Sequence, residues 1–427
     1  MLSAYYSYLD SVPARLADRV VCIGPPPPAR SYLNVGAVVA AAEGARCDAI
    51  HPGYGFLSEN AALARACHEV GVIFIGATEE QLKSVGDKWR AREIATTAAL
   101  PVIPGGFVET TDQAETLIGE IGLPALVKAV GGGGGRGMKR VDRLEDLAQM
   151  MELASSEAGA AFGDARVYLE RFLTRGRHIE VQVLGDGEGR VIHLGERDCS
   201  VQRRYQKLIE ETPAPSLTRS LRRRIQEAGV RFAKRLAYRG AGTVEFLVDV
   251  EHGAFYFLEM NARIQVEHPV TEAVTGVDLV AEQIAIAGGS GLRLRQPDVH
   301  PRGCAIECRV NAEDPARGFQ PSPGRVSEVV WPAGPGIRVD THIGSGSRIP
   351  PFYDSLMAKI IAHGPARPAA LARLREAIAS ARVEGVATNL PFHADVLADR
   401  EFQAGGVDTG FVARLLERGS GTSERPP

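Results

Sequence analysis

Two short apolar runs separated by three residues constrain the fold of this chain more than any other feature. Residues 242–250 and 254–260 flank Glu251, His252 and Gly253, and such runs on either side of so short a connection predict a β-hairpin. A hairpin symmetric about His252 would place Glu245 directly opposite Glu259, with their Cβ atoms about 5 Å apart. Facing carboxylates repel each other, and a hard divalent cation with oxygen ligands compensates them. The hairpin therefore predicts a magnesium site.

The charged face of this hairpin continues past its second strand. Because side chains alternate along a strand, the face that carries Glu259 also carries Asn261 and Arg263. Two carboxylates, an amide oxygen and a guanidinium in one row suit phosphoryl transfer. The alternative is an exposed hairpin edge with solvated charges, but Phe246 and Phe257 favour partly buried strands.

A run of glycines supplies the second candidate site. Lys128 closes an apolar strand, and residues 131–137 read Gly-Gly-Gly-Gly-Gly-Arg-Gly. Backbone N–H groups unshielded by side chains can approach phosphate oxygens, and Lys128 and Arg136 add positive charge. The spacing is not that of a Walker A loop, because Met138 separates the last glycine from Lys139. The alternative is a flexible hinge loop without a ligand.

The order of the expected elements indicates three regions. Three short apolar strands, two of them preceded by alanine-rich helical sequence, predict a parallel sheet at the start of the chain. A small strand–helix–strand unit around the glycine loop looks like a lid. Long strands follow it, and then a block of short strands with one helix. The residues are 20–23, 47–50 and 72–75 for the parallel sheet; 123–130, 144–155 and 166–172 for the lid; 179–259 for the long strands; and 303 onwards, with a helix at 369–381, for the last block.

Composition limits the classes of partner. Lys and Arg number 49 against 52 Asp and Glu, and the net charge of −3 gives no field that would attract nucleic acid or acidic lipid. The basic run 221–235 has apolar residues at helical spacing, which predicts an amphipathic helix. The six cysteines lack the spacing of a zinc site and fit reduced thiols. With no apolar stretch near the roughly 18 residues of a membrane span and no secretory leader, we expect a cytoplasmic protein without nucleic-acid or membrane partners.

Five segments together resemble the biotin carboxylase family of the ATP-grasp superfamily, and the match covers essentially the whole chain. They are KAVGGGGGRGM (128–138), RHIEVQVLGD (177–186), ERDCSVQRR (196–204), EMNARIQVEHPVTE (259–272) and ECRVNAED (307–314). The resemblance implies an α/β (α+β) ATP-grasp fold with a truncated parallel-sheet N-terminal domain, a mobile glycine-loop lid and a mixed-sheet C-terminal domain. The implied domains are an N-terminal domain at 1–84, an ATP-grasp domain at 85–295 with its lid at about 103–173, a C-terminal domain at 302–412 and a disordered tail at 413–427.

The resemblance also implies roles for individual residues. The residues that it assigns to ATP are Lys88, Lys128, Gly134, Gly135, Glu170, Arg171, Phe172, Leu173, His178, Gln202, Tyr205, Lys207, Glu245, Leu247 and Glu259. Two Mg²⁺ or Mn²⁺ ions would be held by Glu245, Glu259 and Asn261. Bicarbonate and biotin would contact Arg263, Gln265, Val266, Glu267, Arg309 and Tyr54. Catalysis would fall to Arg263, Glu267 as the general base, Lys207 beside the transferred phosphoryl group and Arg309 beside the biotin ureido oxygen.

Each implied catalytic role has a physical basis. The fork of an arginine such as Arg263 matches a planar oxyanion. A glutamate within reach of bicarbonate can take its proton, and Lys207 with the metals would neutralise charge on the γ-phosphoryl oxygens. The alternative for Arg263 and Glu267 is a surface ion pair four residues apart on a helix, which the preceding strand disfavours.

The activity implied is ATP-dependent carboxylation of biotin by bicarbonate through carboxyphosphate. It is the first half-reaction of an acyl-CoA carboxylase of the acetyl-CoA type, which serves fatty acid biosynthesis. The only Met-Lys dipeptide, Met138-Lys139, lies beside the glycine loop, so we expect biotin on a separate carrier protein, a separate carboxyltransferase and a homodimeric carboxylase. The alternatives are another ATP-grasp carboxylate-amine ligase and a non-catalytic nucleotide-binding subunit.

The chain departs from the family pattern at two places. Tyr205 stands where a histidine is usual, which puts the nucleotide contacts there in question because tyrosine carries no charge near neutral pH. Only residues 1–19 precede the first apolar strand, so one strand and one helix are expected to be missing. Unpaired backbone groups would then cost about 1 to 3 kcal/mol each, with reduced stability or weaker dimerisation.

Overall fold

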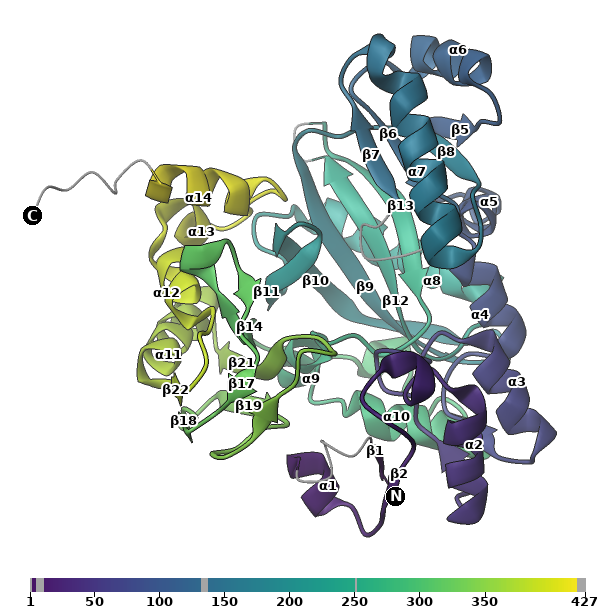
Figure 1. Cartoon of the computed structure of the whole chain (residues 1–427). Helices are drawn as coiled ribbons and strands as arrows, with labels where there is room; N and C mark the ends of the chain where they lie inside the picture. Colours follow the sequence, from purple (N-terminus) through teal and green to yellow (C-terminus); the bar gives the residue numbers. More distant parts are fainter. Residues whose placement is uncertain (1, 5–10, 132–136, 250–251, 421–427) are drawn as a thin grey trace, which may run out of the picture.

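The computed structural model describes residues 2–4, 11–131, 137–249 and 252–420. A large central sheet joins three outer parts (Figure 1): the N-terminal region at the lower right, a lid at the upper right and the C-terminal helices at the left. No helix among the described residues is both long and apolar enough to cross a membrane.

The central sheet has eight strands, and every neighbouring pair in it is antiparallel. Its order is β13-β12-β9-β10-β11-β14-β21-β19. The strands are β9 (Gly176–Asp186), β10 (Val191–Arg203), β11 (Gln206–Thr212), β12 (Arg239–Asp249), β13 (Ala254–Asn261), β14 (Cys304–Asn311), β19 (Ile337–Thr341) and β21 (Leu356–Gly364). Because β11 pairs with β14, the sheet runs without a break from the predicted hairpin into the C-terminal region.

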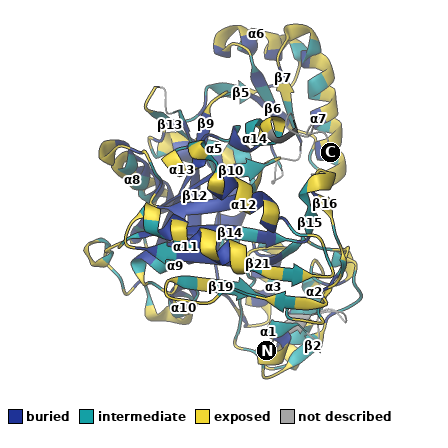
Figure 2. Ribbon diagram, turned by 90° about the vertical axis from the view of Figure 1, so that its left-hand side faces the viewer, coloured by how far each residue is buried: buried dark blue, intermediate teal, exposed yellow. Residues whose placement is uncertain are grey.

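Helix α8 (Arg219–Arg235) packs on one face of this sheet. Its apolar side, including Ile225 and Phe232, is fully buried, whereas most of its arginines face solvent. The ring of Phe232 stacks on Phe257 of the hairpin with 4.6 Å between centroids. The predicted amphipathic helix is confirmed, and Figure 2 shows how deeply the strands beneath the helices are buried.

The lid is a four-stranded antiparallel sheet of order β5-β8-β6-β7, covered by two helices. Its elements are β5 (Gly105–Phe107), α6 (Thr111–Ile121), β6 (Ala125–Ala129), β7 (Met138–Val141), α7 (Leu147–Phe162) and β8 (Val167–Arg171). Gly137 ends the glycine loop at φ 69°, and a Cβ there would lie 2.8 Å from the Cβ of Ala129. A side chain at this position would therefore clash with the strand that carries Lys128. The predicted ATP contacts Gly134 and Gly135 lie outside the described residues.

The N-terminal region differs from the single parallel sheet that we predicted. Strands β3 (Ala49–Ile50) and β4 (Ile73–Phe74) pair with each other in parallel, but in the described residues β2 (Val20–Cys22) pairs only with β1 (Leu2–Ala4). Strand β1 and the short helix α1 (Val12–Leu16) precede β2.

Helices and short strands complete the chain. The remaining helices are α2 (Val35–Gly44), α3 (Ala61–Glu69), α4 (Glu79–Gly86), α5 (Lys88–Thr97), α9 (His268–Thr275), α10 (Leu279–Ala285), α11 (Arg367–Ser380), α12 (Leu390–Ala398), α13 (Arg400–Ala404) and α14 (Phe411–Ser420). The short strand pairs are β15 (Glu313–Asp314) with β16 (Gln320–Pro321), β17 (Gly324–Arg325) with β20 (Arg348–Ile349), and β18 (Glu328–Val330) with β22 (Arg382–Glu384).

Helix α14 extends into the segment that we predicted as a disordered tail. Residues 413–420 belong to α14, because Phe411 and Val412 are buried and Leu415 and Leu416 pack against the C-terminal core. The prediction of disorder from residue 413 is therefore wrong over this helix. Residues 421–427 lie outside the described part of the chain.

Candidate active site

Three glutamates lie side by side across the central sheet. Glu245 on β12 is the cross-strand partner of Glu259 on β13 and of Glu180 on β9, and Glu180 is in turn the partner of Arg197 on β10. The predicted pairing of Glu245 with Glu259 is confirmed. We call these four residues the acidic row.

The hairpin contains a register shift that the sequence did not predict. Between the turn and the acidic row, Phe246 pairs with Phe257, one residue out of the register expected from symmetry about His252. The extra residue is Leu258, which forms a bulge and restores the predicted register at Glu259. The bulge aims the second carboxylate at the first.

Lys207 on β11 gathers three buried carboxylates around one ammonium group. Its Nζ lies 2.6 Å from Glu180 Oε2, 3.0 Å from Glu245 Oε1 and 2.7 Å from Glu267 Oε1. We call these four residues the Lys207 cluster. Burial alone would raise the pKa of Glu267, but Lys207, Arg309 and Arg197 together hold it well below its ordinary value. Against burial, Lys207 and His178 likewise lower the pKa of Glu245, so Glu245 and Glu267 are kept ionised.

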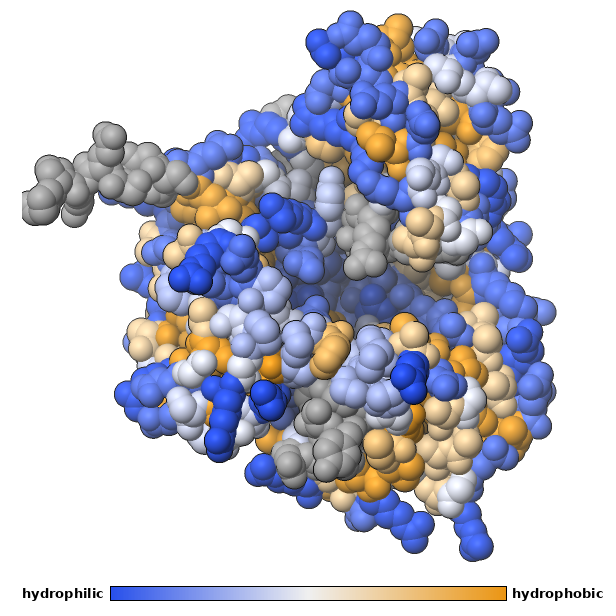
Figure 3. All heavy atoms as spheres, viewed as in Figure 1, coloured by the Kyte–Doolittle hydropathy of each residue, from blue (hydrophilic) through white to orange (hydrophobic). Residues whose placement is uncertain are grey.

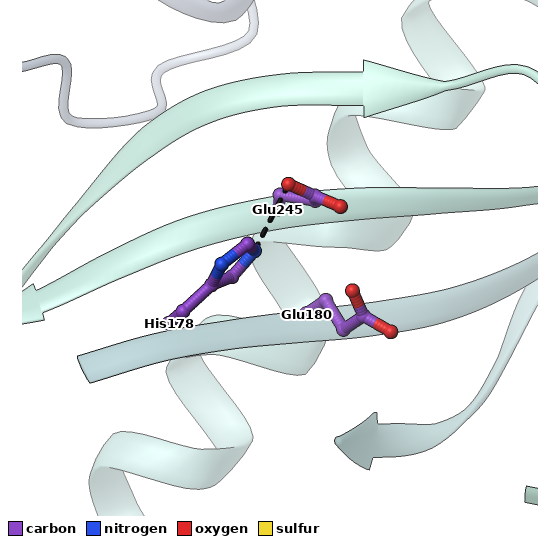
Figure 4. Close-up of side chains that lie close together, drawn as sticks. All are labelled: His178, Glu180 and Glu245. Carbon is purple, nitrogen blue, oxygen red and sulfur yellow. Dashed lines mark ion pairs between the residues drawn. The ribbon is translucent and has the colours of Figure 1, made fainter. Parts of the chain in front are cut away.

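His178 lies on the same face of the sheet (Figure 4). Its Nε2 is 2.9 Å from Glu245 Oε2, and donor atoms of His178, Glu180 and Glu245 all lie within 4.8 Å of one another. Burial disfavours the charged imidazolium and by itself would lower the pKa of His178. The carboxylates of Glu245 and Glu180 outweigh this effect of burial, so the pKa of His178 is raised. This trio could hold a cation, and Lys207 already bridges its two carboxylates.

Beyond β13, alternate side chains continue the charged face as predicted. Asn261 Nδ2 donates to Glu245 Oε1 at 2.9 Å, and Arg263 donates to Asn261 Oδ1 at 3.0 Å and to Gln265 Oε1 at 2.9 Å. Gln265 Nε2 lies 3.2 Å from Glu245 Oε1. Residues 262–267 are not helical, so the alternative of a helical ion pair between Arg263 and Glu267 is wrong.

Two residues that we did not predict, Glu59 and Lys359, form hydrogen bonds to residues 262–267 from other regions of the chain. Glu59, just before α3, accepts hydrogen bonds from Ala262 N at 2.9 Å and from Arg263 Nε at 3.0 Å. Lys359 on β21 donates to the carbonyl oxygen of Val266 at 2.8 Å. The only sequence hint for Glu59 was its closeness to the predicted Tyr54 loop, and Lys359 lies in an ordinary apolar strand. All three regions of the chain thus meet at residues 262–267.

Arg309 on β14 lies on the other side of Glu267. Its guanidinium donates to Glu267 Oε2 at 2.8 Å and, through Nε, to Glu210 Oε1 at 2.6 Å. Tyr54 lies near it: burial raises the pKa of this phenol, Arg309 lowers it and Glu307 raises it. Glu267 therefore joins two cations, Lys207 through one oxygen and Arg309 through the other.

The predicted lid residues form a separate ionic group. Glu170 on β8 accepts from Lys128 at 3.0 Å and from Arg92 at 2.8 Å, and all three are largely buried. Lys88, at the start of α5, lies 3.6 Å from Glu259 Oε2 and its backbone N–H donates to Val130 at 3.2 Å. Lys88 thereby links the lid to the acidic row.

The other predicted nucleotide contacts are spread over β8 and the segment after it, β12 and the β10–β11 hairpin. Arg171 turns away and donates to the carbonyl of Ile121 at 2.8 Å. Tyr205 lies at the tip of the β10–β11 hairpin with φ 66° and is 53% exposed. Gln202 is the cross-strand partner of Lys207. The remaining predicted contacts are Phe172 and Leu173, which follow β8, and Leu247, which lies two residues beyond Glu245 on β12.

The face of the molecule in Figure 3 is hollowed between the lid and the C-terminal part, and the visible floor of the hollow is hydrophilic. Ammonium, guanidinium and carboxylate groups gathered on one sheet can bind a polyphosphate and a small oxyanion together. An ionised glutamate between two cations can take a proton from a substrate bound there.

Three models of known protein families match successive parts of the chain. The biotin carboxylase N-terminal domain matches residues 5–82, the ATP-binding domain of the carbamoyl-phosphate synthase L chain matches 87–295, and the biotin carboxylase C-terminal domain matches 307–414.

Similar proteins extend over nearly the full length. The biotin carboxylase of Nostoc sp. is 50% identical over 416 residues, which cover 96% of this chain and 93% of that protein. The chloroplastic biotin carboxylase of Arabidopsis thaliana is 46% identical over 97% of this chain and 78% of that protein.

Solved structures agree with these matches. The biotin carboxylase complex from Campylobacter jejuni superimposes with a TM-score of 0.94 at 42% identity, covering 96% of this chain and 92% of that chain. The biotin carboxylase domain dimer of Hydrogenobacter thermophilus 2-oxoglutarate carboxylase, with MgADP, ADP and bicarbonate, gives 0.92 at 42% identity, covering 96% and 91%. The chain belongs to the biotin carboxylase family.

Proposed function

We propose that this chain carboxylates biotin with bicarbonate at the expense of ATP, as the first half-reaction of an acyl-CoA carboxylase. The observation that carries the proposal is the position of Glu267, whose two oxygens bind Lys207 and Arg309 at 2.7 and 2.8 Å. A base that contacts both cations can take part in ATP cleavage on one side and in biotin carboxylation on the other. Lys207 faces the predicted phosphate side, and Arg309 faces the predicted biotin side.

The residues present fit a hard divalent cation. Glu245, Glu259 and Asn261 offer oxygen donors, and Glu259 is the least paired of the three glutamates in the row, with Lys88 at 3.6 Å as its contact. We assign Mg²⁺ or Mn²⁺ to these side chains because such ions prefer carboxylate and amide oxygens. When bound, the ions would neutralise charge on the β- and γ-phosphates.

The side chains of this chain perform the binding steps and the first proton transfer. Bicarbonate would lie against Arg263, Gln265 and the backbone of Val266, where Lys359 and Glu59 fix the segment. A phosphate arriving at Lys207 would compete with Glu267 for the ammonium group. Losing that contact raises the pKa of Glu267, so nucleotide binding would turn a weakly basic carboxylate into a better proton acceptor.

The later steps require a site closed to water. The bicarbonate oxygen attacks the γ-phosphorus, ADP leaves, and the resulting carboxyphosphate separates into CO₂ and phosphate. Biotin N1 gives its proton to the released phosphate and attacks CO₂, while Arg309 stabilises negative charge on the ureido oxygen. The lid with Lys128 and the glycine loop would exclude water, which otherwise destroys the intermediate.

The proposed half-reaction implies two partner proteins. Biotin would arrive on a separate carrier protein, and a separate carboxyltransferase would use the carboxybiotin. The relative from Hydrogenobacter thermophilus is described as a domain dimer, which supports a homodimer here.

The test is the substrate dependence of ATP hydrolysis. We expect hydrolysis to require bicarbonate and to rise when free biotin is added. Hydrolysis that needs bicarbonate but ignores biotin, and rises with an amine instead, would identify a different carboxylate-amine ligase. ATP binding without hydrolysis would identify a non-catalytic subunit.

A further inference from the structure

Behind Arg309, two buried glutamates face each other across neighbouring strands of the central sheet. Glu210 on β11 and Glu307 on β14 are cross-strand partners, and both are fully buried. Residues directly opposite in neighbouring strands have Cβ atoms about 5 Å apart. Glu210 binds Arg309 through one oxygen, while its Oε2 and both oxygens of Glu307 have no hydrogen-bond partner among the described residues.

Two carboxylates that share a single salt bridge cannot both remain ionised in such a place, because burial and mutual repulsion both penalise the second charge. Burial raises the pKa of Glu307 well above its ordinary value, and Glu210 adds to the rise against the pull of Lys359 and Arg309. Burial also raises the pKa of Glu210, to about 7. A shared proton satisfies the pair, since a neutral carboxyl can donate to the carboxylate opposite.

Charged groups on each neighbouring element act electrostatically on Glu210 and Glu307. Arg309 follows Glu307 by two residues on the same face of β14, and Glu267, beside α9, adds a negative charge. Lys359 on β21 lies opposite Arg309, with Asp340 of β19 at 3.5 Å from its Nζ. Tyr54 lies on the side of the N-terminal region.

The position of the pair gives it a consequence for the reaction. Arg309 is held between Glu210 on one side and Glu267 on the other. With one proton on the pair, a single negative charge lies behind the guanidinium. Loss of that proton puts a second negative charge there, which draws the guanidinium back from the biotin side.

We propose that Glu210 and Glu307 hold one proton between them and that this proton positions Arg309 for biotin. Glu307 is a positioning residue that acts through Arg309 and does not touch a substrate. The inference rests on the proposed function for its biotin half, while the shared proton is independent of it.

The test compares Glu307→Gln, which imitates the protonated carboxyl, with Glu196→Gln as a matched control. Glu196 is also buried on the central sheet, but Arg222 at 2.7 Å and Gln226 at 2.6 Å satisfy its carboxylate. Infrared difference spectra between neutral and alkaline pH should show the band of a protonated carboxyl in the wild type and in Glu196→Gln, and lose it in Glu307→Gln. Thermal melting verifies that each variant is folded.

The second readout is the KM for free biotin in ATP hydrolysis, measured from neutral to alkaline pH. We expect this KM to rise by about tenfold for each unit above the pKa of the pair in the wild type, and to stay flat in Glu307→Gln. An unchanged infrared band in Glu307→Gln would overturn the shared proton, and an unchanged KM profile would overturn the positioning of Arg309. If the wild type shows the band but no response to biotin at any pH, the proposed function fails and the biotin half of the inference fails with it.

Discussion

Two clusters of buried glutamates on the same sheet are balanced in opposite ways. In the Lys207 cluster, one ammonium group contacts all three carboxylates at 2.6 to 3.0 Å. In the pair behind Arg309, one carboxylate has a cation at 2.6 Å and the other has no partner in the described residues. Cations compensate the negative charge of the first cluster, whereas a shared proton reduces the negative charge of the second. Similar side chains on neighbouring strands can thus be kept ionised or neutral by their contacts alone.

This comparison separates two tasks. In the proposed function, the Lys207 cluster faces the phosphate site, where its fixed charges would stabilise a transferred phosphoryl group without reorganisation. The pair behind Arg309 lies away from that site and can change its charge by binding or releasing a proton. Glu267 belongs to the first cluster and contacts the arginine of the second.

Removing the cation of the first cluster should have the largest effect. Lys207→Met leaves three buried carboxylates without their common partner, so the free energy of unfolding should fall by about 3 to 5 kcal/mol. ATP turnover should fall on the order of 1000-fold, as when other charge-stabilising groups are lost from phosphoryl-transfer sites. Urea unfolding and hydrolysis assays measure both. Lys83→Met, at an exposed pair with Glu79, is the control, and equal losses in the two variants would contradict the special role of Lys207.

Removing the base that links the two clusters should affect turnover more than stability. Glu267→Gln keeps the shape of the side chain but cannot accept a proton, so bicarbonate-dependent turnover should fall by about 100- to 10,000-fold. ATP binding, measured by calorimetry, should persist. Glu196→Gln, the same change at a satisfied carboxylate, should retain turnover. Wild-type turnover in Glu267→Gln would instead support a nucleotide-binding site with another base.

Neutralising the second cluster should stabilise the fold at high pH. Burial raises the folded-state pKa of Glu307, so between its unfolded and folded pKa values the folded state binds a proton that the unfolded state has lost. Stability therefore falls as pH rises through this window. Glu307→Gln lacks that penalty, and its advantage over the wild type should grow by up to about 1.4 kcal/mol for each pH unit. Urea unfolding at pH 5 and pH 8 measures the difference; an advantage that is the same at both pH values would mean that Glu307 is ionised throughout.

A change outside both clusters should have the smallest effect. Tyr205 is 53% exposed at a hairpin tip, so Tyr205→His should change the KM for ATP by less than about threefold, as exposed substitutions usually do. Steady-state kinetics measure it. A change of tenfold or more would show that the hairpin tip contacts the nucleotide.

The hairpin half of the acidic row, Glu245 and Glu259, could be predicted from sequence because it depends on local rules. Strand alternation and a short turn were sufficient to pair Glu245 with Glu259 and to extend the face to Arg263. The bulge at Leu258 was not predicted, since nothing in the apolar run distinguishes one register from its neighbour near the turn. The same local rules missed the separation of β2 from β3. They also missed the length of α14, which depends on packing against the C-terminal core.

Contacts between distant strands could not be predicted in this way. Glu59 is 204 residues from Arg263, Lys359 is 93 residues from Val266, and Glu210 is 97 positions before its partner Glu307. No local pattern encodes such distances, because the order of strands in the sheet determines them. Glu180 stood within a recognised motif, yet its part in the Lys207 cluster follows only from the register of β9 against β12.

The central claim is that Glu267 serves ATP cleavage on one side and biotin carboxylation on the other. The most direct measurement is the transfer of labelled carbon from bicarbonate to free biotin, recovered as acid-labile carboxybiotin. We predict labelled biotin that requires ATP and a divalent cation, and that is lost in Glu267→Gln. Hydrolysis of ATP with bicarbonate but without labelled biotin would contradict the claim.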